Sequence, residues 1–93
     1  NLERVVNNLI FVNEYVNRIT WMENPENQVE LLSYRVYGKV KGNGDDTYEL
    51  IAELDPTVMG YDDRGLEEDQ YFTYKITAVS FRGKESDPVI VSN

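Results

Sequence analysis

The chain has 93 residues, of which 41% are hydrophobic and 12% aromatic, and its formal net charge is −8. This length fits one domain with a modest core, and the acidic balance disfavours nucleic acids and anionic lipid surfaces as partners. Cysteine and histidine are absent, which excludes disulfide scaffolds, thiol nucleophiles, Ser-His-Asp catalysis and zinc sites built on either residue.

The N-terminal region contains the longest apolar stretch, Leu9-Ile10-Phe11-Val12, which has four residues. A membrane span needs about 20, so no span is expected. We predict a strand over residues 5–12, because asparagine and β-branched residues weaken the alternative, an amphipathic helix over residues 3–15. Because the chain begins with Asn1 rather than methionine, we expect residues 1–93 to be a single domain excised from a larger protein.

The next two predicted strands alternate between an apolar and a polar face, the period of a half-buried strand. The first covers residues 16–22 and turns Trp21 inward. The second covers residues 34–37 and turns Tyr34 inward and Tyr37 outward. Both patterns predict strands of an antiparallel sheet with one face in the core.

The remaining pattern predicts four more strands, over residues 48–54, 59–61, 72–78 and 89–91. The clearest is 72–78, in which Phe72 and Tyr74 face inward while Thr73 and Thr77 face water. Turn formers separate the strands, at Asn24–Asn27, residues 41–46 and Arg82–Lys84. Seven short strands predict an all-β antiparallel sandwich.

Five motifs in order resemble the fibronectin type III family over essentially the whole chain. They are Ile19-Thr20-Trp21 with Asn24-Pro25, residues 32–37, residues 61–66, residues 72–79, and Gly83-Lys84-Glu85-Ser86 with Pro88. The resemblance implies an immunoglobulin-like, seven-stranded β-sandwich with three strands against four. It also implies a non-catalytic spacer or protein-interaction module of a larger extracellular, cell-surface or periplasmic protein, without a cofactor, whose partners are neighbouring domains.

One position departs from the family pattern. Six residues after the leucine that corresponds to Leu66, the family carries a tyrosine whose hydroxyl bonds to the backbone of the preceding corner, and here Phe72 stands. We therefore expect that hydrogen bond to be missing, and Tyr71 to point the other way. The bond is worth about 1 kcal/mol.

Enzymatic activity is not expected. Without cysteine and histidine, the chemistry left is hydrolysis by a pair of carboxylates, which needs a cleft that holds an acid on either side of the bond. A sandwich of this size with a filled core offers no such cleft.

Three groups of residues are candidates for binding. The carboxylates Asp62, Asp63, Glu67, Glu68 and Asp69 crowd around one predicted loop, and oxygen ligands of this kind suit calcium. Alternatively, they form a solvated acidic edge that favours solubility.

The outward tyrosines Tyr37 and Tyr71 are candidates for a glycan platform, or they pack across neighbouring strands without a ligand. Arg82 and Lys84 form a basic loop that could contact another protein, or that serves solubility alone. Some family members carry Arg-Gly-Asp at this loop. Lys84 stands in place of the aspartate here, so integrin binding is not carried over.

Overall fold

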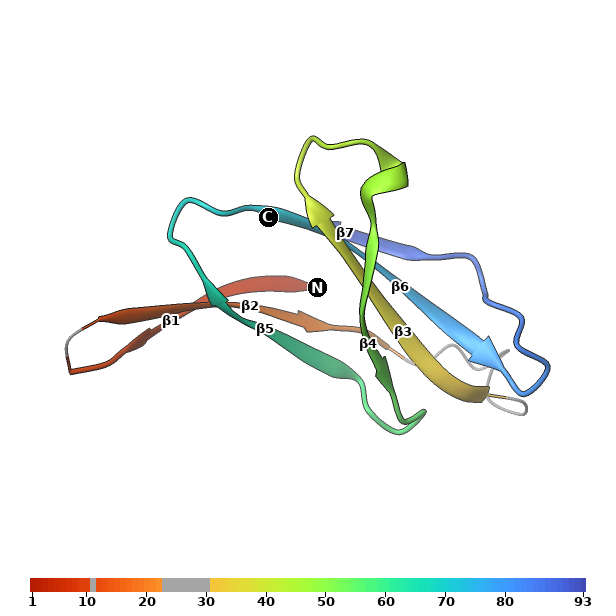
Figure 1. Ribbon diagram of the computed structural model, residues 1–93. Helices are drawn as coiled ribbons and strands as arrows, with labels where there is room; N and C mark the ends of the chain where they lie inside the picture. The colour runs from red at the N-terminus through yellow and green to blue at the C-terminus, as the bar shows by residue number, and fades with distance from the viewer. Residues whose placement is uncertain (11, 23–30) are drawn as a thin grey trace.

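The computed structural model describes residues 1–10, 12–22 and 31–93, which form seven strands in two antiparallel sheets. The strands are β1 (Leu2–Asn8), β2 (Asn13–Thr20), β3 (Leu31–Val40), β4 (Glu49–Leu54), β5 (Gly60–Leu66), β6 (Phe72–Ser80) and β7 (Val89–Ser92), with a 3₁₀ turn η2 (Asp45–Thr47) before β4. One sheet has the order β1-β2-β5 and the other β4-β3-β6-β7 (Figure 1). The predicted sandwich of three strands against four is confirmed.

All seven strands have boundaries that differ from those predicted, by one to five residues at an end. The first segment is a strand, β1, and the alternative helix over residues 3–15 is wrong. β5 is longer than the predicted strand over residues 59–61, because it pairs with β2 along its length. The predicted turn at Asn24–Asn27 lies outside the described residues. Among the residues that are described, no helix has the length and hydropathy needed to cross a bilayer.

The core lies between the sheets and is built from inward residues of both. Its buried members are Ile19, Leu31, Tyr34, Val36, Tyr74 and Ile76. Trp21 and Phe72 pack against this cluster as predicted. Trp21 meets the Tyr34 ring edge-on with centroids 5.5 Å apart, a favourable geometry for an aromatic pair.

The expectation that Thr73 and Thr77 face water is wrong, since their exposed fractions are only 9% and 3%. Both lie on the outer face of the four-stranded sheet, between β3 and β7. Thr73 forms a hydroxyl hydrogen bond with Ser92 of β7, and Thr77 pairs in register with Arg35. Period two therefore assigns the face of the sheet correctly but not the burial, because neighbouring side chains flank the short threonines.

The β1–β2 hairpin projects from one end of the sandwich. Its register carries β1 and β2 on to Asn8↔Asn13, whereas the pairing of β2 with β5 ends at Tyr15↔Leu66. Figure 1 shows the hairpin reaching out beyond the other strands. The radius of gyration is 14.3 Å, against about 12 Å for a compact chain of this length. The corner between β5 and β6, residues 67–71, lies at the same end of the sandwich. We call this end of the molecule the corner pole.

Candidate functional site

Arg4, on β1, holds the corner. Its Nε donates to Asn17 Oδ1 at 2.7 Å, and its Nη1 donates to the carbonyl oxygens of Glu67 and Glu68 at 3.5 and 3.3 Å. Its Nη2 donates to the carbonyl of Gln70. A guanidinium presents several donors in one plane, so one side chain binds three carbonyls of the corner and an acceptor on β2.

Asn17 is fully buried at the centre of a polar network between the two sheets. Its Nδ2 donates to the Tyr74 hydroxyl at 2.8 Å and to Asn93 Oδ1 at 3.0 Å, while its Oδ1 accepts from Asn93 Nδ2 at 3.1 Å. The Tyr74 hydroxyl in turn donates to Asp63 Oδ2 at 2.6 Å. The buried amide is thus satisfied on both sides, as burial of a polar group requires.

A bulge in β5 brings Asp63 to this network. Between the pairs Tyr15↔Leu66 and Asn17↔Asp63, the register shifts by one residue. Gly65 lies in the bulge with φ of +72°, a conformation that favours glycine. Burial and the hydrogen bond to Asp63 raise the pKa of Tyr74, so the hydroxyl stays protonated and keeps donating to the carboxylate.

The missing corner hydroxyl is replaced. Phe72 cannot make the bond that the family resemblance implies, and the guanidinium of Arg4 binds the corner carbonyls instead. Tyr71 points outward, as expected, and is 53% exposed. The Arg4 guanidinium carbon lies 5.6 Å from the centroid of its ring, within the range of a cation–π contact.

A shallow hollow of about 360 Å³ lies beside Tyr71. We call it the Tyr71 hollow. Its lining comes from the end of β3, the following lysine and the corner: Val40, Lys41, Asp69, Gln70, Tyr71 and Phe72. The amide of Lys41 donates to the carbonyl of Tyr71 at 3.0 Å, and its Nζ donates to the carbonyl of Asn93. The first bond joins the two walls of the hollow, and the second joins Lys41 to the residue that follows β7.

The five candidate calcium ligands do not share one loop. Asp62 and Asp63 lie in β5, so their predicted loop position is wrong, and only Glu67, Glu68 and Asp69 follow the strand. Asp62 pairs with Arg18 at 3.1 Å, and Asp63 accepts from Tyr74. Within the described parts of the chain, no cluster of three or more acidic side chains is placed to hold a metal ion.

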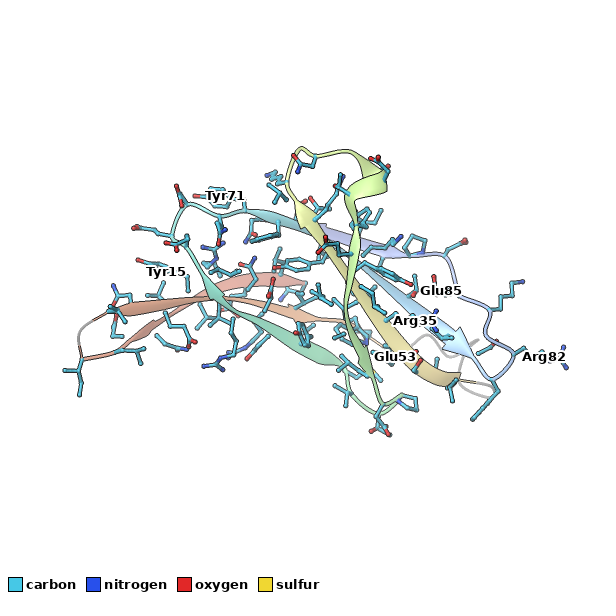
Figure 2. The ribbon with its side chains drawn as sticks, in the orientation of Figure 1. Tyr15, Arg35, Glu53, Tyr71, Arg82 and Glu85 are labelled. Carbon is cyan, nitrogen blue, oxygen red and sulfur yellow. The ribbon has the colours of Figure 1, made fainter. Side chains whose placement is uncertain are left out.

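Tyr37 lies on the outer face of the four-stranded sheet but is not an open platform. Its hydroxyl donates to Glu85 Oε1, and Lys75 Nζ lies 4.5 Å from the centroid of its ring. Arg35 bridges Glu85 at 2.8 Å and Glu53 at 3.0 Å (Figure 2). The hydrogen bonds from Tyr37 and Arg35 lower the pKa of Glu85, so its carboxylate stays charged. The Tyr37 hydroxyl and the Arg35 guanidinium are therefore already bound to protein groups.

Arg82 and Lys84 lie on an exposed turn at the end opposite to the corner pole. Figure 2 shows Arg82 at one end of the molecule and Tyr71 at the other. Ser80 Oγ accepts from both of their backbone amides, at 3.3 and 3.2 Å. The structure therefore does not bring the basic loop and the exposed tyrosine together, and contact through this loop stays a prediction.

Sequence reasoning missed the apolar end of the β1–β2 hairpin. Leu9, Ile10 and Val12 are 55%, 91% and 64% exposed, and we call them the hairpin tip. The apolar run was visible in the sequence and was too short to cross a membrane. Its position at a projecting turn, rather than in the core, depends on where β2 and β5 stop pairing.

Comparison with known proteins shows the fold rather than a family. No family model matches the sequence, and no curated protein is similar to it. An Fn3-like protein from Clostridium thermocellum is 26% identical, with a TM-score of 0.64 over 99% of this chain and 84% of that chain. The chain therefore has an Fn3-like fold, as the sequence motifs predicted.

Two pectate lyases have a region of the same fold. Pectate lyase PelI from Erwinia chrysanthemi, solved in complex with tetragalacturonic acid, is 18% identical, with a TM-score of 0.71 over 99% of this chain and 28% of that chain. Pectate lyase Pel3 from Pectobacterium carotovorum is 14% identical, with a TM-score of 0.71 over 97% of this chain and 25% of that chain. The chain spans about a quarter of the length of these enzymes.

Proposed function

We propose that the chain is a non-catalytic interaction module of a larger extracellular polypeptide, which docks on an adjoining domain through its hairpin tip. The observation that carries this proposal is the hairpin tip. Ile10 is 91% exposed at the end of a projecting hairpin, and an apolar cluster of this kind is typical of a contact surface rather than of a free one.

The pairing of its carboxylates supports a binding rather than a catalytic role for the module. Asp63 is bound by Tyr74, and Glu53 and Glu85 are bridged by Arg35. Carboxylates held in such pairs stabilise a fold, whereas hydrolysis needs two of them facing a substrate across a cleft. These three carboxylates are therefore bound by side chains of the module itself.

The comparisons support an adjoining domain. In two pectate lyases this fold makes up 28% and 25% of the chain, so it occurs beside other structure in those enzymes. Asn93, which follows β7, is bonded to Asn17 and Phe72 at the corner pole. A domain attached beyond Asn93 would start at the end of the sandwich from which the β1–β2 hairpin projects, where it could cover the hairpin tip.

The test replaces the hairpin tip by polar residues, as Leu9→Ser with Ile10→Ser. In residues 1–93 alone the unfolding midpoint should move little, since exposed substitutions cost within about 0.5 kcal/mol. In the longer polypeptide the same pair should uncouple the module, which would then unfold at the midpoint of the isolated chain. Calorimetry of both proteins measures this.

Val89→Ser with Ile90→Ser is the matched control, because these β7 residues are also more than half exposed and lie away from the hairpin. The control pair should leave the coupling intact. If the tip pair leaves the longer polypeptide unchanged, or destabilises residues 1–93 by several kcal/mol, the docking role is refuted. Cleavage of a polysaccharide by residues 1–93 would refute the non-catalytic role.

A further inference from the structure

The Tyr71 ring is held in place before any ligand arrives. The Arg4 guanidinium lies 5.6 Å from its centroid, and Arg4 is itself fixed by Asn17 and by the corner carbonyls. The backbone carbonyl of Tyr71 accepts from the Lys41 amide at 3.0 Å. An aromatic ring that is already ordered loses little conformational entropy when a ligand stacks on it.

Uncommitted polar groups surround this ring. Within the described residues, neither the Tyr71 hydroxyl nor the Asp69 carboxylate forms a hydrogen bond, and Gln70 uses only its Oε1, which accepts from the Glu67 amide at 2.8 Å. The hollow therefore offers an acceptor at Asp69, a donor at the Gln70 amide group, and a hydroxyl that does both. Paired donors and acceptors beside an aromatic face match the hydroxyl groups and apolar C–H faces of a sugar ring.

The size of the hollow agrees with a small ligand. Its volume of about 360 Å³ falls in the range of small-molecule sites, about 300–1,000 Å³, which are typically lined by aromatic residues with a few polar groups. The hollow is open, so a chain of sugars could pass along it with one ring on Tyr71.

Charge selects the class of saccharide. Asp69 lines the hollow, Glu67 and Glu68 precede it in the corner, and the whole chain carries −8. Two cations also lie at this end, but N–H groups of both already donate to backbone oxygens, from Arg4 to the corner carbonyls and from Lys41 to Asn93, which leaves three carboxylates against two positive charges around the hollow. A polyuronate would be repelled by this surface, whereas an uncharged polysaccharide would not.

We propose that the Tyr71 hollow binds a neutral oligosaccharide or polysaccharide, with the sugar ring stacked on Tyr71 and its hydroxyl groups bonded to Asp69 and Gln70. This binding activity is separate from docking on an adjoining domain, because it uses a different surface of the module. It rests on the proposed function only in taking the module to be non-catalytic.

Retardation in native gels tests the proposal. Residues 1–93 are run through gels that contain hydroxyethyl cellulose, arabinoxylan, galactomannan or polygalacturonate. We expect at least one of the three neutral polymers to retard the chain and polygalacturonate not to do so. Tyr71→Ala should weaken the retardation at least about tenfold, a change that such gels resolve, and Tyr71→Phe should retain most of it.

Phe81→Ala is the matched control, since Phe81 is another exposed aromatic residue, 69% exposed, in the turn at the opposite end. It should bind like the unmodified chain. Circular dichroism melts of all variants show that each is folded. The proposal is overturned if none of the three neutral polymers retards the chain, if Tyr71→Ala binds as well as Phe81→Ala, or if only polygalacturonate binds.

The release of reducing ends is measured on the same polymers. Cleavage would contradict the non-catalytic role, whereas a lack of retardation would contradict the Tyr71 hollow alone. The two proposals therefore fail on different measurements.

Discussion

Replacing Arg4 by methionine should destabilise the chain more than replacing any surface arginine. Methionine keeps most of the apolar stem of arginine and removes the guanidinium, which donates to Asn17 and to three corner carbonyls. The Asn17 oxygen keeps one partner, Asn93 Nδ2, so it is not left unsatisfied. The loss then consists of the bonds themselves and of the contact with the Tyr71 ring.

The magnitude follows from the surroundings of each bond. The bond to Asn17 is part-buried and charged, which makes it worth about 1.5 kcal/mol. The corner bonds are open to solvent, and together with the cation–π contact they add about 1 kcal/mol. A total of about 2.5 kcal/mol lowers the melting temperature of a domain of this size by about 10–20 °C.

Arg64→Met is the matched control. Arg64 is also on a strand and pairs with Glu14 at 2.7 Å, but 58% of its side chain is exposed, and such a pair contributes less than about 1 kcal/mol. Melting followed by circular dichroism compares the two variants at pH 7. Equal melting temperatures for Arg4→Met and Arg64→Met would refute the assignment of Arg4 as the residue that holds the corner.

Two further outcomes follow from the polar networks. Tyr37 and Arg35 lower the pKa of Glu85 in the folded chain, so the unfolded chain takes up a proton first as the pH falls. The stability that Glu85→Gln removes, measured by urea unfolding, should therefore be fully present above about pH 4.5 and shrink below it; a difference independent of pH would contradict this. Tyr74→Phe keeps the ring in the core but removes the hydroxyl that binds Asp63, and should cost about 1–3 kcal/mol in the same assay, whereas a cost near zero would show that the hydroxyl is not needed.

The strands could be predicted from the sequence because period two is a local property. The alternation that turns Trp21 inward also turns Asn17 inward, so a buried polar residue on β2 was readable as a signal. What it binds was not readable. Its partners Tyr74 and Asn93 are 57 and 76 residues away, and only the stacking of the two sheets brings them together.

The bonds from Arg4 that replace the corner hydroxyl could not be predicted either, because they join residues far apart in the sequence. The sequence indicates that Phe72 lacks the hydroxyl, but Arg4 is 66 residues from Gln70, whose carbonyl it binds. The predicted loop position of Asp62 and Asp63 was wrong for a different reason. Their spacing suggests one loop, and β5 extends through Asp62 and Asp63 because β2 offers partners for both.

The network around Asn17 has a consequence for the speed of unfolding. It joins residues separated by 57 and 76 positions, and such contacts form only after long loops have closed. We therefore expect them to form late, on the native side of the folding barrier. Their main effect is to slow escape from the native state rather than to hasten its formation. A cluster of this kind lengthens the native lifetime in the presence of a protease, because cleavage that outpaces reclosing is governed by the rate of unfolding.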